Sequence, residues 1–242
     1  MKILHLVLYS DNDKNYVKMY EVLSPYYKRF SDVTTYFYKY NDNISDNIEI
    51  TGDIINIKGV ESYIHIPGIL NKTINVLQLF KNNGEYEKYD YIIRSNISSI
   101  VNLSLLSEQL ELKPVEYYGS TNVGEEKGIP FASGTNIILS KKGYITLVDN
   151  INLLDKTLID DVSIAFLFDK LNIKITKVDK AGGDGYVNVP LVNSYLEYEK
   201  LVGCDYLVYR NKCCDNRHYD VINMNNIIKV LISKINYMNI GM

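Results

Sequence analysis

The ten residues YDYIIRSNIS at positions 89–98 decide the fold, because an apolar run ends there in a polar group that favours a turn. Residues 89–94 predict a buried strand, and the Ser/Asn group after them predicts a turn into a helix. The chain begins in the same way. A continuous apolar run over residues 3–9 is typical of a strand covered on both faces, and the Asp/Asn residues after it can cap a helix over residues 15–30.

Strand and helix signals continue to alternate through the first two-thirds of the chain. Residues 33–40 and 53–58 predict strands, and apolar residues at helical spacing predict a helix over residues 69–83. This β-α-β alternation predicts an α/β fold with a mainly parallel, doubly wound sheet and helices on both faces. The strands that start near four residues should be neighbours in that sheet: Ile3, Val33, Asp53 and Tyr89.

The later part of the chain is less regular. After a Gly-rich loop at 117–130, strands are expected over 131–139 and 173–178, a turn over 181–185, and helices over 141–150, 160–171 and 221–238. No internal repeat occurs, and no segment poor in apolar residues divides the chain. One domain over residues 1–242 is therefore expected.

The composition excludes several classes of protein. Of the 242 residues, 46% are hydrophobic and 23% are charged, as in an ordinary globular protein. The net charge of -3 argues against a protein that binds duplex nucleic acid, since such proteins carry a basic face. No run approaches the roughly 20 apolar residues of a membrane span, and the first residues lack the cleavage site of a signal peptide.

The cysteines and the codon bias bear on where the protein works. Cys204, Cys213 and Cys214 suit neither a disulfide framework nor a metal site, so a reducing, cytoplasmic compartment is expected. The excess of Asn, Ile, Lys and Tyr indicates an AT-rich genome, such as that of a bacterium, a protist or a large DNA virus. For a viral protein the location would be the host cytoplasm.

Candidate ligand-binding residues follow the strands, because ligands of open α/β sheets bind beyond the carboxyl ends of the strands. The residues at these places are Tyr9, Ser10 and Asp11 after the first strand, the group Arg94 to Ser98 after the fourth, and Asp160 and Asp161 at a later helix start. The first strand is not followed by Gly-x-Gly-x-x-Gly, and no P-loop occurs, which disfavours nicotinamide dehydrogenases and methyltransferases. A nucleotide can still lie on the strand ends, with side chains contacting base and ribose.

Four segments, in the same order along the chain, resemble the β-1,3-galactosyltransferase and fringe family of glycosyltransferases. They are Glu61-Ser62-Tyr63 with Leu70-Asn71-Lys72-Thr73, the strand and turn at 89–102, the segment FASGTNIILS at 131–140, and DDVSIA at 160–165. The resemblance implies a GT-A type fold in a single domain, with a nucleotide-sugar-binding half at 1–112 and an acceptor half with the C-terminal helix at 113–242. It also implies transfer of a sugar, with inversion, from a UDP-sugar to a hydroxyl of a glycan or protein.

The chain departs from the resembling family where that family binds manganese. In place of an acidic triplet it has Asn96-Ile97-Ser98, and a neutral amide and hydroxyl are poor ligands for Mn²⁺ or Mg²⁺. A divalent cation would therefore be bound weakly or be replaced by fixed positive charges, which can stabilise a leaving diphosphate equally. Besides Lys72 and Arg94, the candidates for binding the diphosphate are Arg210, Lys212, Arg217 and His218.

The resemblance also assigns roles to the candidate residues. Asp161 is the expected catalytic base, because the second acid of the family's motif has that role. Its neighbour Asp160 points about 100° away on a helix and is placed with Ser133 and Gly134 on the acceptor side. The expected donor-binding residues are Tyr9, Ser10, Asp11, Lys72, Arg94, Ser95, Asn96 and Ser98.

Each of these assignments has a purely structural alternative. Asp160 and Asp161 can complement a helix dipole, Asn96 and Ser98 can cap the helix that follows, and the basic residues can be solvated surface charges. Two alternatives to a glycosyltransferase also stay open. One is a nucleotidyltransferase, although its Gly-rich signature after the first strand is missing. The other is a degenerate protein that binds nucleotide sugars or glycans without catalysis.

Overall fold

The structure is a computed structural model. It describes residues 1–61, 65–119, 124–126, 128–176, 185–190, 192, 194–212 and 217–240, without the side chains of His65, 124–126 and 237–240. Several predictions fall outside these residues: Ser62-Tyr63 of the first motif, parts of the 117–130 loop, the end of the 173–178 strand, most of the turn at 181–185, and Cys213 and Cys214.

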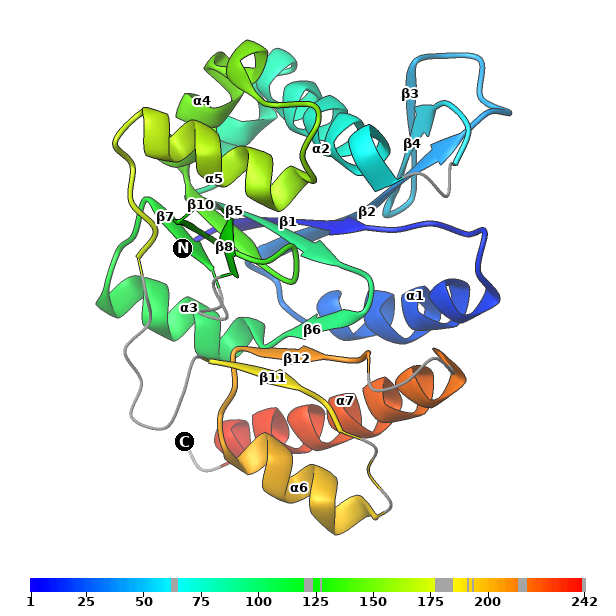
Figure 1. The fold of residues 1–242 in the computed structure, drawn as a ribbon. Helices are drawn as coiled ribbons and strands as arrows, with labels where there is room; N and C mark the ends of the chain where they lie inside the picture. Colours follow the sequence, from blue (N-terminus) through cyan, green and yellow to red (C-terminus); the bar gives the residue numbers. More distant parts are fainter. Residues whose placement is uncertain are drawn as a thin grey trace.

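A seven-stranded sheet, ordered β3-β4-β2-β1-β5-β10-β7, forms the centre of the molecule (Figure 1). Its strands are β1 (Ile3–Leu8), β2 (Val33–Asn41), β3 (Ile48–Thr51), β4 (Ile54–Lys58), β5 (Tyr91–Asn96), β7 (Tyr117–Gly119) and β10 (Ile137–Ser140). Strands β4, β2, β1 and β5 are adjacent and parallel, which confirms the predicted neighbours and the α/β class. Strand β3 pairs antiparallel with β4, and β10 pairs antiparallel with both β5 and β7.

Helices cover both faces of this sheet, as the alternation predicts. Helices α2 (His65–Asn82), α4 (Lys141–Asp149) and α5 (Asp160–Lys170) lie on one face, and α1 (Lys14–Tyr27) and α3 (Leu103–Leu112) lie on the other. The side chains of β1 alternate accordingly. Leu4 and Leu6 pack into the core beneath α2, α4 and α5, whereas Ile3 and Val7 pack into the core on the α1 and α3 side.

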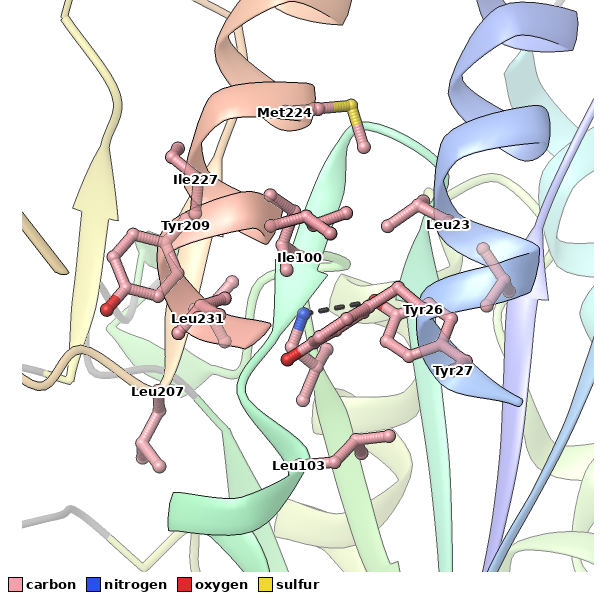
Figure 2. Packing of buried hydrophobic residues seen from close by; sticks show 14 of the residues in the cluster. Leu23, Tyr26, Tyr27, Ile100, Leu103, Leu207, Tyr209, Met224, Ile227 and Leu231 are labelled. Carbon is pink, nitrogen blue, oxygen red and sulfur yellow. Dashed lines mark hydrogen bonds between the residues drawn. The ribbon is translucent and has the colours of Figure 1, made fainter. Parts of the chain in front are cut away.

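A second, three-stranded sheet lies beside α1 and has the order β11-β12-β6. It consists of β6 (Ser99–Val101), β11 (Tyr186–Asn188) and β12 (Val208–Arg210), and it is covered by α6 (Tyr195–Gly203) and α7 (Arg217–Ile240). Figure 2 shows the core it shares with α1, where Tyr26 and Tyr27 face Ile100, Tyr209 and Leu231. The Tyr27 hydroxyl accepts a hydrogen bond from the Val101 amide at 3.1 Å, which fixes α1 to β6.

The remaining elements show where local sequence signals were insufficient. They are β8 (Gly124–Glu126), β9 (Ile129–Phe131) and the 3₁₀ turns Glu85–Lys88 and Ile151–Leu153. The turn predicted after residue 94 is wrong in part, because β5 continues to Asn96 and residues 99–101 form β6. The strand predicted over 131–139 is divided between β9 and β10. Strand β3 was not predicted. Of the strand predicted over 173–178, the described residues form a single bridge, between Thr176 and Tyr118.

His5 is fully buried in the middle of β1, as expected for a core histidine. Its Nε2 lies 2.8 Å from the Ser95 hydroxyl, and its ring meets Tyr27 edge-on with centroids 4.7 Å apart. Burial lowers the pKa of His5 from 6.5 to about 3, since the charged ring would have no water around it. The folded protein therefore keeps this ring neutral at any pH near neutrality.

The burial of His5 should make the protein sensitive to mild acid. Between pH 6.5 and 3 the unfolded chain binds a proton at this histidine and the folded chain does not, so stability rises with pH in that window and is lost as pH falls. At 1.36 kcal/mol per pKa unit, His5 should lower the free energy of unfolding by about 2 kcal/mol between pH 7 and pH 5. Urea unfolding at both pH values measures this. Between pH 7 and pH 5 the free energy of unfolding of His5→Gln should fall by about 2 kcal/mol less than that of the wild type. An equal fall in the two proteins would show that other groups cause the sensitivity to acid.

Candidate active site

The candidate site lies at the carboxyl ends of β1, β2, β4 and β5, and a buried ion pair forms its floor. Arg94 is in β5 and Asp160 is the first residue of α5; the Arg94 Nη2 lies 2.7 Å from the Asp160 Oδ2. Both side chains are at least 95% buried. The same Asp160 oxygen accepts a hydrogen bond from Thr73 on α2 at 3.2 Å. Three elements that are far apart in sequence are thus joined at one carboxylate.

Asp161 lies next to this pair but faces a different group. Its Oδ2 accepts a hydrogen bond from the Gly134 amide at 2.8 Å, and its Oδ1 accepts one from the Val162 amide at 2.9 Å. Burial raises the pKa of the Asp161 carboxyl above its usual value, and the negative charge of Asp160 adds to the rise. Asp161 is less deeply buried than Asp160, so it remains the better placed of the two acids for contact with a ligand.

The turn that holds Asp161 belongs to the predicted acceptor segment. Ser133 accepts a backbone hydrogen bond from Asn136 at 3.1 Å, which closes the turn before β10. The Gly134 carbonyl accepts a hydrogen bond from the Arg94 Nη1 at 2.5 Å, so one residue contacts both the arginine and Asp161. The structure therefore brings Gly134, Asp160 and Asp161 together, as the motif order predicts.

Lys72 points into the same region from α2 and is paired with Glu61. The Lys72 Nζ lies 2.8 Å from both Glu61 carboxylate oxygens and 5.2 Å from the ring centroid of Tyr40. Burial lowers the pKa of Lys72, and Glu61 partly offsets this by favouring the charged form. Lys72 is therefore a buried, pre-positioned cation and not a solvated residue on a helix face.

A polar cavity of about 360 Å³ opens beside Lys72 at the ends of β1, β2 and β4. It is lined by Asp11 and Asn12, by residues 39–43, and by residues 59–61. Lys39 forms an ion pair with Asp11 inside this lining. Gly59 has a φ of +152°, and a Cβ there would lie 2.8 Å from the Tyr40 ring, so the close approach of these two strand ends requires glycine.

The residues predicted after β1 divide between cavity and core. Asp11 is exposed in the cavity, and the Ser10 hydroxyl accepts a hydrogen bond from the Asn12 amide at 3.4 Å. Tyr9, in contrast, is buried and stacks on Tyr20 with ring centroids 5.4 Å apart. Burial, followed by the charge of Asp11, raises the pKa of Tyr9 to about 12. Of the three predicted residues Tyr9, Ser10 and Asp11, it is Asp11 that lines the cavity.

The residues at the end of β5 also have different environments. Asn96 accepts a hydrogen bond from the Arg94 Nη1 at 2.7 Å, and Ser98 is buried beneath β12. Ser95 is fully buried on the opposite side of the strand, where it contacts His5. The structure therefore does not bring Ser95 to the site with its predicted donor-binding neighbours.

The second sheet places the backbone of Arg210 and Lys212, two basic residues of the C-terminal part, near Ser98 and Ser99. Pairing of β12 with β6 sets Arg210 opposite Ser99, and the Asn211 amide donates to the Ser98 carbonyl at 2.8 Å. Lys212 is exposed just beyond. This pairing brings two predicted diphosphate-binding residues to the place where Asn96-Ile97-Ser98 replaces the acidic triplet.

Arg217 and His218 begin α7. The Arg217 Nη1 lies 2.5 Å from the Asp220 carboxylate, and its guanidinium lies 5.3 Å from the ring centroid of Tyr16 on α1. His218 is exposed. Arg217 is thus held against the first turn of α1, with part of its charge already balanced by Asp220.

The side chains around Ser98 do not fit a divalent cation. Asn96, Ser98 and the fully buried Asn211 are all neutral. Asp90, a further acid in the motif, accepts a hydrogen bond from the Lys2 amide at the opposite end of the sheet. Across the described residues, no group of three or more His, Cys, Asp or Glu side chains is arranged to hold a metal ion.

Sequence reasoning missed two parts of this site. Lys39 and Tyr40 lie at the carboxyl end of β2 and Gly59 follows β4, so the strand-end rule applied to the second and third predicted strands would have pointed to this region. Asn211 could not be found in this way, because its position depends on the pairing of β12 with β6, about 100 residues earlier in the chain.

Comparison with known proteins identifies the fold. No protein-family model and no curated protein sequence matches the chain. A solved glycosyltransferase involved in the glycosylation of the major capsid of PBCV-1 superposes with a TM-score of 0.51 and 12% sequence identity, over 93% of this chain and 99% of that one. The chain shares its fold with this glycosyltransferase. The apo-form glycosyltransferase GlyE of Streptococcus pneumoniae TIGR4 gives a TM-score of 0.48 at 15% identity, over 97% of this chain and 64% of that one.

Among the described residues, no helix is both long enough and apolar enough to span a membrane.

Proposed function

We propose that the protein is a glycosyltransferase that moves a sugar from a nucleotide diphosphate donor, a UDP-sugar, to a hydroxyl of a glycan or protein. One observation carries the proposal: the Asp161 carboxylate is held by the Gly134 amide at the strand-end edge, connected through buried ion pairs to a polar cavity. The fold shared with a solved glycosyltransferase and the four motifs in order support it.

In the proposed reaction Asp161 accepts the proton of the acceptor hydroxyl. The acceptor oxygen forms a bond to the anomeric carbon while the bond from that carbon to the diphosphate oxygen breaks, and its electron pair leaves with the nucleotide diphosphate. Attack opposite the leaving group inverts the anomeric configuration. The resemblance to the β-1,3-galactosyltransferase and fringe family rests on the four ordered segments, and inversion is what that resemblance implies.

The donor would lie along the strand ends. Its nucleoside fits the cavity next to Asp11, Tyr40 and Glu61, and its diphosphate would then extend across the end of β1 towards Arg210 and Lys212. Fixed cations there would stabilise the negative charge that develops on the leaving group.

We expect UDP to stabilise the protein and to occupy this region. At a concentration of ~100 times the dissociation constant, a ligand raises the free energy of unfolding by about 2.7 kcal/mol, which a thermal-shift assay detects easily. A co-crystal structure should place UDP between residues 9–11 and 94–96, with the uracil in the cavity. UDP bound only elsewhere would contradict the donor site, and no stabilisation by any nucleotide sugar would contradict the function.

Transfer should depend little on divalent cations, since Asn96, Ser98 and Asn211 provide no carboxylate. Turnover measured with a chelator should stay within about threefold of turnover with manganese, because fixed cations substitute for the metal. Complete loss with chelator, restored by manganese, would show that other carboxylates bind the ion. Asp11 would be the first to test, because it lines the cavity.

A non-catalytic role is the second candidate, and the neutral Asn96-Ile97-Ser98 segment favours it. Such a protein would bind nucleotide sugars or glycans and release no nucleotide diphosphate. Binding of a UDP-sugar without release of UDP, in the presence of a broad set of hydroxyl acceptors, would favour this role over transfer. A viral source and a cytoplasmic location are proposals that rest on the codon bias and on the cysteine content.

A further inference from the structure

The Arg94 guanidinium is enclosed by protein groups and does not face the polar cavity. Its Nη1 donates to the Gly134 carbonyl at 2.5 Å and to the Asn96 side chain at 2.7 Å, and its Nη2 contacts Asp160 at 2.7 Å. Only 5% of the side chain is exposed. An arginine that binds a diphosphate presents its N–H groups to the ligand, whereas the two terminal nitrogens of this one are directed to a carbonyl, an amide oxygen and a carboxylate, and its Nε is buried.

Asp160 is fixed equally well from the other side. Thr73 donates to it at 3.2 Å, and the Tyr38 hydroxyl lies 3.0 Å from the Thr73 hydroxyl. This chain of contacts runs from β2 through α2 to the start of α5. Asp160 is therefore a fixed anchor for Arg94, with 1% of its surface exposed.

Gly134 connects this anchor to Asp161. Its carbonyl accepts from Arg94 and its amide donates to the Asp161 Oδ2 at 2.8 Å. A Cβ at this position would lie 2.6 Å from the Arg94 Nη1, so the guanidinium can approach the turn this closely only because residue 134 is glycine. Residue 134 thus contacts the arginine through its carbonyl and Asp161 through its amide.

We propose that Arg94 and Asp160 are positioning residues, whose buried ion pair fixes the Gly134 turn so that the Gly134 amide holds the Asp161 carboxylate in place. The catalytic meaning of that placement rests on the proposed function, since it is there that Asp161 is the base. A general base must lie within hydrogen-bond reach of the hydroxyl proton it accepts, so its orientation is decisive. Arg94 acts in this arrangement through Gly134, without contacting the donor.

The same arrangement places opposite charges next to Asp161. Burial and then Asp160 raise its pKa, whereas the Gly134 amide and then Arg94 lower it. Tyr117 on β7 also interacts electrostatically with Asp161, and Lys72 on α2 interacts electrostatically with Asp160. Strand β9, which packs against α5, contributes Ile129, Pro130 and Phe131, which carry no charge.

The first test is a carboxyl NMR titration of the free protein, with the Asp161 signal assigned by its absence in Asp161→Asn. Arg94→Met removes a neighbouring cation and should raise the pKa of Asp161 by about one unit, while Asp160→Asn removes an anion and should lower it by a similar amount. Shifts of opposite sign would show that both charges of the pair act on Asp161, and the exchange of the Gly134 amide then tests whether the pair also positions the turn. If the pKa of Asp161 stays unchanged in both variants, the proposal is overturned.

The second test is hydrogen exchange of the amide at position 134. Gly134→Ala pushes a methyl group into the guanidinium, so this amide should exchange at least about tenfold faster as its bond to Asp161 loosens. Gly203→Ala is the matched control, because a Cβ at Gly203 meets no atom within 4 Å. Equal exchange in the two variants would mean that Arg94 does not set the turn.

Arg94→Lys covers the case in which Arg94→Met does not fold. A lysine keeps the positive charge but lacks the planar fork that reaches Gly134, Asn96 and Asp160 together. The Gly134 amide should then exchange faster, and the pKa of Asp161 should rise less than in Arg94→Met, because the positive charge is kept while the hydrogen bond from Gly134 loosens. An amide that exchanges at the wild-type rate in this variant would contradict the proposal.

These measurements separate the present inference from the proposed function. Both tests use the unliganded protein, so they can succeed even if no nucleotide sugar is bound or turned over. UDP binding, measured by calorimetry, tests the competing role of Arg94 as a donor ligand. A tenfold loss of UDP affinity in Arg94→Lys, with the pKa of Asp161 and the exchange at Gly134 unchanged, would assign Arg94 to the donor and overturn the positioning role.

Discussion

Replacing Asp161 by asparagine should lower turnover by roughly 100-fold or more, the usual contribution of a general base. Asparagine keeps the shape of the side chain and its ability to accept the Gly134 hydrogen bond, but it cannot take a proton at neutral pH. A 100-fold loss corresponds to about 2.7 kcal/mol of transition-state stabilisation. The measurement is release of UDP in the presence of donor and acceptor, compared with the wild type.

Donor binding should stay within about twofold in Asp161→Asn, because the proposed role of this carboxylate concerns the acceptor hydroxyl. Asp169→Asn is a suitable control. Asp169 lies on the same helix and pairs at 2.6 Å with Lys174 near the surface, so its replacement should leave turnover unchanged. Equal losses in the two variants, or unfolding of Asp161→Asn, would indicate that Asp161 serves only the start of α5.

The raised pKa of Asp161 changes one part of the sequence argument. From the position at a helix start, the dipole and the free amides were expected to favour the charged form. Two amides do bind this carboxylate, but burial and the adjacent Asp160 outweigh them. The helix start is visible in sequence, whereas burial depends on the tertiary structure.

It was predictable that the central parallel strands are neighbours, because strand and helix signals alternate and β1 carries a largely apolar run typical of a sheet covered on both faces. The short strands β6 and β12 carry no comparable signal. They have three residues each, and their pairing joins segments about 100 residues apart, so local pattern contains no information about it. The basic residues near Ser98 could be suspected from sequence but not placed.

Strand alternation explains why the neighbouring side chains of Arg94 and Ser95 lie in different environments. Successive side chains of a strand point to opposite faces, so one of these neighbours had to face α2 and α5 and the other α1. Arg94 meets Asp160 on the first face, and Ser95 meets His5 on the second. The alternation itself is readable in sequence. Whether Arg94 or Ser95 is directed towards the site depends on the position of Asp160, and only the structure shows that position.

Replacing Arg94 by methionine should reduce the free energy of unfolding by roughly 3–5 kcal/mol, because Asp160 would remain as a buried charge without its partner. This is a large part of the roughly 5–15 kcal/mol by which ordinary domains are stable, and urea unfolding measures it directly. Lys142→Met is the control, since Lys142 pairs with Glu116 at the surface with 78% of its side chain exposed and should cost ~1 kcal/mol or less. Combining Arg94→Met with Asp160→Leu should recover much of the loss, because apolar side chains that replace both members of a buried pair are often tolerated. A loss in Arg94→Met no greater than that in Lys142→Met would mean that water reaches Asp160 and that the pair is not the closed floor of the site.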